Sequence, residues 1–301
     1  MVRTVVAGLD GSPESRAAVE WAAREARLRG LPLKIVHVWE PVPGPMAQAP
    51  LLGAETHQHW TERIPREAAE GVSLRNPGLE VSVEQSTGRP ADVLAKTAED
   101  AELLVLGSRG LSGIGGFLIG SVGLSTIAHT ERPVVLVRAG EQAADEHVPD
   151  PVGVPSAATA YRPVVLGLDP TAPDDSVIEF AFDAAARRST SVRVLYGWNL
   201  PPYYTYALAA DPGYHDEIVR QQSEALAAAL RPWRQKYPDV EVVEESRAGS
   251  APNHLTDASR DASLLVVGRR IRRGPVGFHT GPVTHAVLHH AAAPVAVIAH
   301  N

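Results

Sequence analysis

The chain has 301 residues, about twice the length of an average domain, and its 44% hydrophobic content is ample for two cores. A net charge of −7 gives no basic face for nucleic acid, and the lack of cysteine excludes disulfides and thiolate chemistry. No charged leader precedes a longer apolar core, and no apolar run approaches membrane-spanning length. We therefore expect a cytoplasmic protein that binds neither nucleic acid nor membranes.

The first half predicts strands that alternate with helices. An apolar strand at residues 4–8 leads through Asp10 into a helix, and a second strand follows at residues 34–39. A long connection with a helix, a third strand and a further helix come next. The apolar strand 103–107 then leads into a glycine-rich loop, a helix that begins at Ser121, and a last strand at 134–137.

The second half repeats this order, which indicates a duplication. The opening TVVAGLDGSPES matches PVVLGLDPTAPDDS, so Asp10 corresponds to Asp169, and LLVLG at 103–107 matches LLVVG at 264–268. A segment rich in Pro, Ala and acidic residues separates the copies. We predict domains at residues 1–140 and 162–301, joined by a linker at 141–161.

Strands alternating with helices favour parallel βαβ units, and the apolar runs suit strands that are buried on both faces. We predict two tandem α/β domains, each a doubly wound, Rossmann-like, five-stranded parallel sheet with strand order 3-2-1-4-5. Ligands of such sheets lie beyond the C-terminal strand ends at the topological switch point. Three segments should meet there in the first half: Gly8 with Asp10, Val38, and the glycine-rich loop.

The loop after residues 103–107 has the composition of a phosphate cradle. Gly107, Gly110 and Gly120 are separated by two and then nine residues, and Ser121 follows. Glycine allows a tight turn or φ > 0 and lets backbone N–H groups approach an anion. The first turn of a helix from Ser121 adds free N–H groups and a positive dipole end, and its hydroxyl can cap the helix or donate to a phosphoryl oxygen. We predict a phosphorylated ligand; the alternative is a flexible surface loop.

Two charged residues near this loop each have two interpretations. Asp10 is a candidate for binding ribose hydroxyls, although turn and N-cap chemistry could equally explain an Asp before Gly-Ser-Pro. Arg109 can pair with a phosphate or can be an ordinary exposed loop arginine.

These features together resemble the universal stress protein family in its tandem, ATP-binding form. The resemblance rests on Asp10, on His37–Val38, on the glycine-serine spacing and on the RPVVLV strand that follows. It implies that Asp10 contacts the ribose, that the Val38 backbone contacts adenine, and that Mg²⁺ or Mn²⁺ accompanies the ATP. The phosphates would be held by Gly107, Gly110, Gly120, Ser121 and Val122. With neighbouring loop residues, the predicted first site comprises Gly8, Asp10, Val38, Gly107, Ser108, Arg109, Gly110, Gly113, Gly120, Ser121 and Val122.

The glycine loop of the second half departs from this pattern. Ile271 stands at the Gly110 position, where it resists φ > 0, and Pro282 at the Ser121 position removes a hydroxyl and an N–H donor. We predict a weakened second nucleotide site at Gly167, Asp169, Gly268, Arg269, Gly274 and Gly281. The alternatives concern the loop arginines, which can hold an anion through their side chains, be solvated, or pair with a partner. These arginines are Arg269, Arg270, Arg272 and Arg273.

The function stays open between two classes. One is a nucleotide-dependent regulator, in a stress or growth-arrest response, whose occupancy biases a surface that an unidentified protein reads. The other is an ATP-consuming enzyme, but loop 108–117 holds no Asp, Glu or His to position water or metal. We predict no enzyme, or at most a slow ATPase, with another adenine nucleotide such as a cyclic form as the alternative ligand.

Two further expectations concern metals and assembly. His285, His289 and His290 have no Cys or carboxylate nearby, so no protein-held metal site is predicted. The apolar last strands, 134–137 and 295–298, would lie at sheet edges that need covering. The family resemblance likewise implies assembly, and we expect a homodimer of tandem chains.

Overall fold

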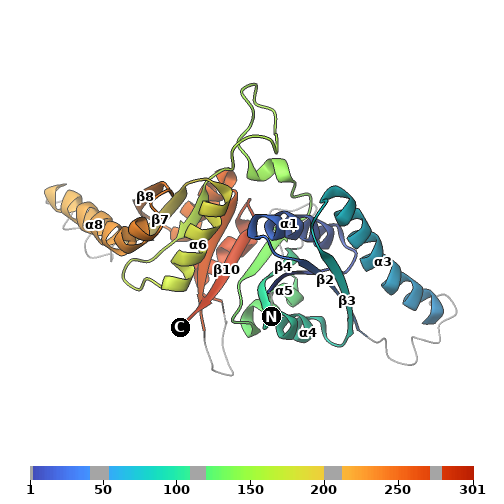
Figure 1. Cartoon of the computed structure of the whole chain (residues 1–301). Helices are drawn as coiled ribbons and strands as arrows, with labels where there is room; N and C mark the ends of the chain where they lie inside the picture. The colour runs from blue at the N-terminus through green and yellow to red at the C-terminus, as the bar shows by residue number, and fades with distance from the viewer. Residues whose placement is uncertain (1–2, 41–53, 109–119, 200–211, 272–279) are drawn as a thin grey trace. The chain divides into compact units, whose positions relative to one another are not determined.

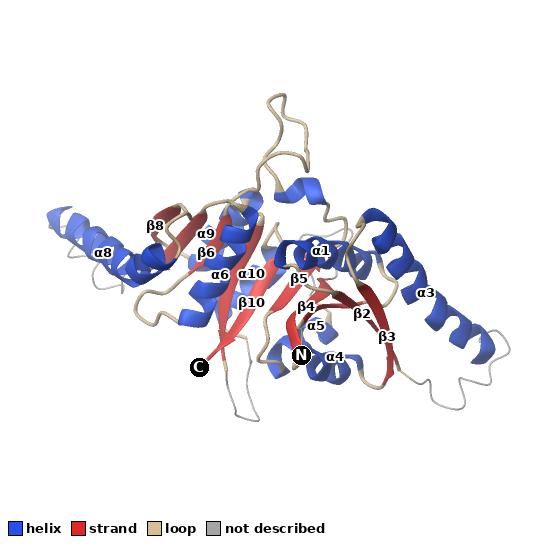
Figure 2. Cartoon of the chain, viewed as in Figure 1, coloured by secondary structure: helices blue, strands red, loops and turns tan. Residues whose placement is uncertain are grey.

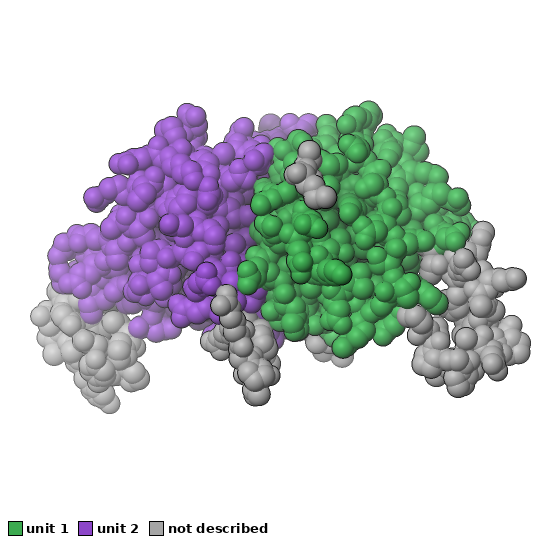
Figure 3. All heavy atoms as spheres, turned by 60° about the horizontal axis from the view of Figure 1, so that its bottom comes forward, with its two compact units in different colours: residues 1–142 green, residues 143–301 purple. Residues whose placement is uncertain are grey.

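The computed structural model describes residues 3–40, 54–108, 120–199, 212–271 and 280–301 (Figure 1). The chain divides into two compact units, residues 1–142 and 143–301 (Figure 3). Each unit is a parallel sheet with helices packed against it. None of the described helices combines the length and the apolar composition needed to cross a bilayer.

The first unit has the strand order β3-β2-β1-β4-β5, and all neighbouring strands run parallel. Helices α1 and α3 pack together on one side of the sheet, and α4 and α5 on the other (Figure 1). The strands are β1 (Thr4–Gly8), β2 (Leu33–Trp39), β3 (Val81–Thr87), β4 (Ala101–Ser108) and β5 (Val134–Arg138). The helices are α1 (Pro13–Arg29), α3 (Ala54–Arg75), α4 (Pro90–Ala98) and α5 (Ser121–His129).

The second unit repeats this arrangement in the order β8-β7-β6-β9-β10 (Figure 2). Its strands are β6 (Val164–Gly167), β7 (Val192–Trp198), β8 (Val242–Ala248), β9 (Leu264–Arg270) and β10 (Val295–His300). Its helices are α6 (Asp175–Arg188), α8 (Pro212–Lys236), α9 (Ala251–Ala258) and α10 (Pro282–His290), with short 3₁₀ turns η1 (Ala143–Glu146) and η2 (Ser259–Asp261). The predicted fold class and strand order are confirmed in both halves.

The sequence signals around α1 explain why the chain turns sharply after β1. Ser12 is the N-cap, and its side-chain oxygen accepts a hydrogen bond from Ser15 N–H (3.2 Å). Pro13 occupies the first helical position, and Gly30 ends the helix in the left-handed conformation with φ 63°. The helix buries Trp21 and a row of alanines, which fixes its N-terminus beside the ends of the central strands.

Residues 143–161, most of the predicted linker, fall within the second unit and carry an ordered turn. One carboxylate oxygen of Asp150 accepts hydrogen bonds from the N–H groups of Val152 (3.0 Å) and Val154 (2.7 Å). An antiparallel bridge between His147 and Tyr161 closes the base of the segment. This segment therefore has internal structure that its composition did not predict.

Candidate functional site

A cavity of about 220 Å³ lies at the C-terminal edge of the first sheet, at the switch point between β1 and β4. The end of β1 contributes Gly8, Leu9 and Asp10, and β2 contributes Val36 and Val38. Gly107 of β4 and the first turn of α5, residues 120–123, complete the wall on the other side. The segments that the sequence predicted to converge therefore do so, as far as they lie within the described residues.

Asp10 is held in a fixed orientation by the residues that start α1. Its Oδ1 accepts hydrogen bonds from the N–H of Ser12 (2.9 Å) and from the Ser12 hydroxyl (2.5 Å). Burial by itself would raise the pKa of Asp10, but the hydrogen bonds from Ser12 and Ser15 outweigh it and hold the pKa below its usual value. Asp10 is thus a preset anionic acceptor that lines the cavity.

The backbone of Val38 extends beyond the end of its neighbour β1. The carbonyl of Val36 accepts a hydrogen bond from Leu9 N–H (2.9 Å), and the backbone groups of alternate residues of a strand face the same side. The N–H and C=O of Val38 therefore face the β1 side, where β1 has already ended at Gly8. The nearby Leu9 carbonyl is taken by His37 Nδ1–H at 2.7 Å. Val38 thus presents its backbone N–H and C=O at the cavity beyond the end of β1, and their contact with adenine stays a prediction.

Gly107 is needed for a different reason from the tight turn that the sequence suggested. It lies within β4, where it pairs with Val137 of β5. A Cβ added to it would lie 2.5 Å from the Glu14 carbonyl carbon and 2.7 Å from Ser15 N, both backbone atoms of α1. Glycine here lets the first turn of α1 approach the strand end, so its role is close packing rather than a special φ.

The start of α5 is an uncapped helix N-terminus. Ser121 begins the helix, as predicted, and Gly120 is the N-cap with φ −62° and ψ 150°. The first intrahelical bond runs from Leu124 N–H to the Gly120 carbonyl at 3.2 Å. The N–H groups of Ser121, Val122 and Gly123 precede that bond and have no acceptor within the helix, so they remain available to an anion in the cavity.

The other predicted residues of the first site divide into two groups. Ser108 is buried, does not line the cavity, and donates its hydroxyl to the Val137 carbonyl at 3.2 Å. Arg109, Gly110 and Gly113 lie outside the described residues. Their predicted roles stay predictions.

Several cavity residues were missed by the sequence analysis. Glu14 and Ser15 come from the first turn of α1, Pro90 and Leu94 from α4, and Gly123 from α5. A helix begins at each of these places, and the N-cap signal Ser12-Pro13 could have pointed to Glu14. Nothing in the sequence indicated which helices would border the site, because that depends on the packing of α4 and α5.

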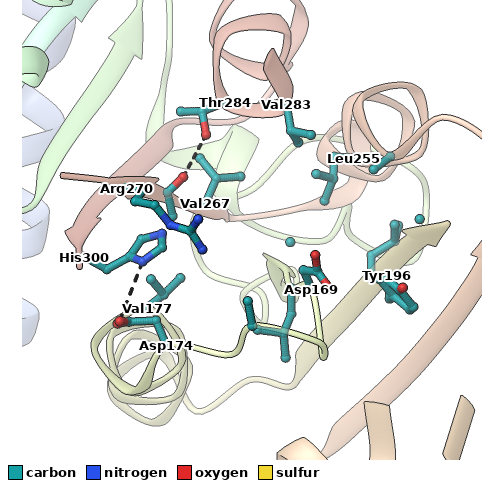
Figure 4. Close-up of a pocket in the computed structure, with 17 residues that line it drawn as sticks. Asp169, Asp174, Val177, Tyr196, Leu255, Val267, Arg270, Val283, Thr284 and His300 are labelled. Carbon is teal, nitrogen blue, oxygen red and sulfur yellow. Dashed lines mark hydrogen bonds and ion pairs between the residues drawn. The ribbon is translucent and has the colours of Figure 1, made fainter. Parts of the chain in front are cut away.

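The second unit has a cavity of about 310 Å³ in the corresponding place (Figure 4). The carboxylate of Asp169 accepts from Thr171 N–H (3.0 Å) and from the Thr171 hydroxyl (2.7 Å), as Asp10 does from Ser12. Gly167 and Gly268 also line this cavity. Gly281 is the N-cap of α10, and Gly274 lies outside the described residues.

The arginine at this cavity is not the one in the predicted site. Arg269 is 3% exposed and is not among the lining residues, whereas Arg270 lines the cavity and is exposed. Side chains alternate along β9, so Gly268 and Arg270 share the cavity face while Arg269 points to the other. No feature of the sequence indicated that the strand extends as far as Arg270, so the alternation of side chains could not be predicted.

Two of the histidines of α10 lie close together. The rings of His285 and His289 lie 4.5 Å apart, and burial together with the neighbouring His289 lowers the pKa of His285. Among the described residues, no group of three or more His, Cys, Asp or Glu side chains is arranged to hold a metal ion.

Comparison with known proteins finds relatives over nearly the whole chain. A model of the universal stress protein family matches residues 1–138 and again 160–299. A universal stress protein of Mycobacterium tuberculosis is 32% identical over 308 residues, covering 97% of this chain and 96% of the relative. One from Mycolicibacterium smegmatis is 29% identical over 304 residues, covering 98% and 96%.

The fold also matches a solved structure. A universal stress protein from Archaeoglobus fulgidus superposes with a TM-score of 0.69 at 17% identity, over 99% of this chain and 98% of the other. At this identity the likeness concerns the fold alone. It extends over both units of the duplicated chain.

Proposed function

Since this chain belongs to the universal stress protein family, we propose that its first unit binds ATP in the cavity beside Asp10. Nucleotide occupancy then biases a surface that a partner protein reads, in a cytoplasmic stress or growth-arrest response. A family name alone does not identify a ligand, so the proposal rests on the chemistry of the cavity.

One observation carries the proposal: the same cavity joins a fixed carboxylate to an uncapped helix N-terminus. Asp10 offers its second oxygen to ribose hydroxyls, because Ser12 occupies only Oδ1. The free N–H groups at the start of α5 and its positive dipole end favour phosphate. A nucleotide is a ligand that presents a diol and an anion together, and it suits this pair of groups.

The base end of the ligand would lie against β2. The N–H and C=O of Val38, which pair with no backbone group among the described residues, match the donor and acceptor groups on an adenine edge. Apolar side chains around them, Leu94 and Leu106, provide a surface for a ring. Other adenine nucleotides, including cyclic forms, share this end and stay alternatives for the same cavity.

A divalent ion would reach this cavity on the nucleotide. Asp10 and Glu14 are the acidic side chains among the described lining residues, too few to hold a metal by themselves. Mg²⁺ usually keeps several waters and is bound through substrate phosphates with one or two carboxylates. We therefore expect Mg²⁺ or Mn²⁺ to bind only together with ATP. Glu14, in the first turn of α1, is the carboxylate that we expect to contact the ion or one of its waters.

A slow ATPase is the second candidate, and Glu14 favours it. The glycine loop carries no acidic residue or histidine, but Glu14 in the first turn of α1 is among the residues that line the cavity. A single carboxylate without a fixed metal or an arginine finger supports only weak catalysis. We expect turnover well below about one per second, the low end for kinases. A rate at or above that value in a phosphate-release assay would favour the enzyme over the regulator.

The binding proposal is tested by a matched pair of substitutions. Gly120→Val places a branched side chain at the N-cap of α5, and Gly281→Val makes the same change at the N-cap of α10, where φ and ψ are closely similar. We expect Gly120→Val to weaken Mg-ATP binding by about a hundredfold or more, because several charge-assisted hydrogen bonds are blocked. Gly281→Val should change it little.

Both variants introduce the same residue at the same kind of helix position, so any shared loss of helix stability cancels. Circular dichroism melts should show matching effects on the two proteins. Equal loss of Mg-ATP binding in both variants would refute the assignment of the site to the first unit.

A further inference from the structure

The second cavity keeps the ribose and base end of the first. Asp169 is oriented by Thr171 as Asp10 is by Ser12, with one oxygen left over. Leu168 N–H donates to the Leu195 carbonyl (3.1 Å), so the backbone of Gly197 faces the β6 side beyond the end of β6. A carboxylate and an open strand end thus recur together.

The opposite end of the second cavity is built differently. Helix α6 has its N-cap at Asp174, so the turn from Asp169 is longer than the turn from Asp10 to Ser12. The atoms of α6 nearest to Gly268 of β9 are therefore side-chain atoms rather than backbone atoms. A Cβ added to Gly268 would meet His300 Nε2 at 2.9 Å and Val177 at 3.2 Å, whereas at Gly107 it meets α1 backbone. Side chains fill the place that a helix turn fills in the first unit.

Two side chains line this end of the cavity. His300 stands at the position of Ala139 in the first copy, and its Nδ1 lies 3.6 Å from an Asp174 carboxylate oxygen. Thr284 stands at the position of Gly123, and its hydroxyl donates to the Gly268 carbonyl at 2.8 Å. Figure 4 shows both contacts as dashed lines on either side of Arg270. In the second unit this end of the cavity is therefore formed by side chains, where the first unit has the backbone of α1.

Arg270 brings a positive charge to the same end of the cavity. It pairs in register with His300 across β9 and β10, so both side chains lie on the cavity face. Figure 4 shows its guanidinium group directed into the cavity, on the side across from Asp169. The lining residues of the first cavity, as far as they are described, include no arginine or lysine. A guanidinium group pairs with a phosphate through two parallel hydrogen bonds.

We propose that the second cavity binds a ribonucleoside monophosphate and disfavours the triphosphate. Asp169 takes the ribose hydroxyls and Arg270 takes the single phosphate, while His300 and Thr284 exclude a longer phosphate chain. The proposal rests on the proposed function of the first cavity, because the base and ribose chemistry is carried over from it. The two units would then respond to different phosphorylation states of one nucleotide.

The experiment uses the full chain with Gly120→Val, which blocks the first cavity, and calorimetric titration with AMP, adenosine and Mg-ATP. We expect one AMP site per chain, with affinity about tenfold or more above those of adenosine and ATP. Arg270→Gln in this background should lower AMP affinity about tenfold and leave adenosine unchanged. Arg231→Gln, an exposed arginine of α8 outside the cavity, is the control.

Two further variants test the exclusion of longer phosphate chains. His300→Ala and Thr284→Gly restore the residue types of the first copy, and each should raise ATP affinity relative to AMP affinity. ATP binding in the Gly120→Val chain as tight as AMP, or an AMP affinity unchanged by Arg270→Gln, would overturn the inference. Lack of AMP binding would also overturn it, and the proposed function would survive if the unmodified chain still bound one Mg-ATP. Failure of Mg-ATP to bind the unmodified chain would contradict both the proposed function and this inference.

Discussion

Ser12 performs two tasks at the edge of the first cavity, and its side chain links local structure to ligand chemistry. Its hydroxyl donates to Asp10 and its oxygen accepts from Ser15 N–H, so one group orients the carboxylate and caps α1. In the second unit the two tasks are separated. Thr171 orients Asp169, and Asp174 caps α6.

Replacing Ser12 with Ala should therefore affect stability, whereas the matched Thr171→Ala should do so less. Loss of the N-cap should lower the free energy of unfolding by about 1 kcal/mol. Thr171→Ala leaves the Asp174 cap intact and should cost about half of that or less. Urea unfolding of both variants measures the difference, and equal losses would contradict the division of tasks.

Ser12→Ala should also change how the stability of the protein depends on pH in acid. The pKa of Asp10 is lower in the folded chain than in the unfolded chain, so the ionised carboxylate stabilises the fold above the unfolded value. This contribution is lost as the pH falls through the folded pKa. Ser12→Ala removes a donor, so the pKa of Asp10 should rise and the loss should occur at higher pH. An NMR titration of the Asp10 carboxyl carbon in both proteins tests this; an unchanged pKa would contradict the role of Ser12.

Gly107 shows that a functional motif can contain a residue that is required for packing. A Cβ at this position meets the backbone of α1, which cannot move without shifting the helix. Gly107→Ala should lower the free energy of unfolding by about 1–3 kcal/mol, as overpacked sites do. Gly268→Ala is the control, because its Cβ would meet only side-chain atoms of His300 and Val177, which can turn. A loss from Gly268→Ala as large as that from Gly107→Ala would contradict this.

At the residue scale, the sequence located the important positions better than it explained them. Asp10 and Ser121 could be placed because a strand end and a helix start have local signals. The close approach of the α1 backbone to Gly107 could not be predicted, since it depends on how α1 packs against β4. Arg269 was chosen over Arg270 because the end of β9, and with it the alternation of faces, cannot be read from an arginine-rich run.

At the element scale, the segments between helices and strands distinguish the two units. The strands and their order are the same, and apolar runs buried on both faces were sufficient to predict them. The turn between β6 and α6 is longer than the turn between β1 and α1. The residues in the first turns of α5 and α10 also differ. These short segments set the chemistry of each cavity, and their packing was not evident from the sequence.

The segment 141–161 was predicted as a linker from its composition, yet within it residues 147–161 form specific backbone hydrogen bonds. Asp150 holds the turn, and Val152 at its tip is 81% exposed. Asp150→Ala should increase amide hydrogen exchange at Val152 and Val154, because both lose their acceptor. Mg-ATP binding should be unaffected, since the segment belongs to the other unit from the first cavity. Exchange that is fast already in the unmodified chain would contradict the ordered turn.

At the scale of the whole molecule, duplication gave one chain two cavities of related design and different chemistry. The first turn of α5, with its free backbone N–H groups, lines the first cavity, and the side chains of Arg270, His300 and Thr284 line the corresponding end of the second. We propose that such chains associate further into homodimers, and light scattering at micromolar concentration should give twice the mass of the chain. A monomeric mass would count against the association and would leave the binding proposal intact.

The most direct test of the account is a calorimetric titration of nucleotide-stripped protein with Mg-ATP, read as the number of sites per chain. We predict close to one site, because α5 begins with Ser121 whereas α10 begins with Pro282, which has no N–H, and because the side chains of His300 and Thr284 line the phosphate end of the second cavity. Two equal sites would mean that these side chains do not prevent a triphosphate from binding in the second cavity. If the titration gives no heat, and ATP also fails to displace a labelled adenine nucleotide in an independent binding assay, the central claim that the first unit is a nucleotide site is contradicted.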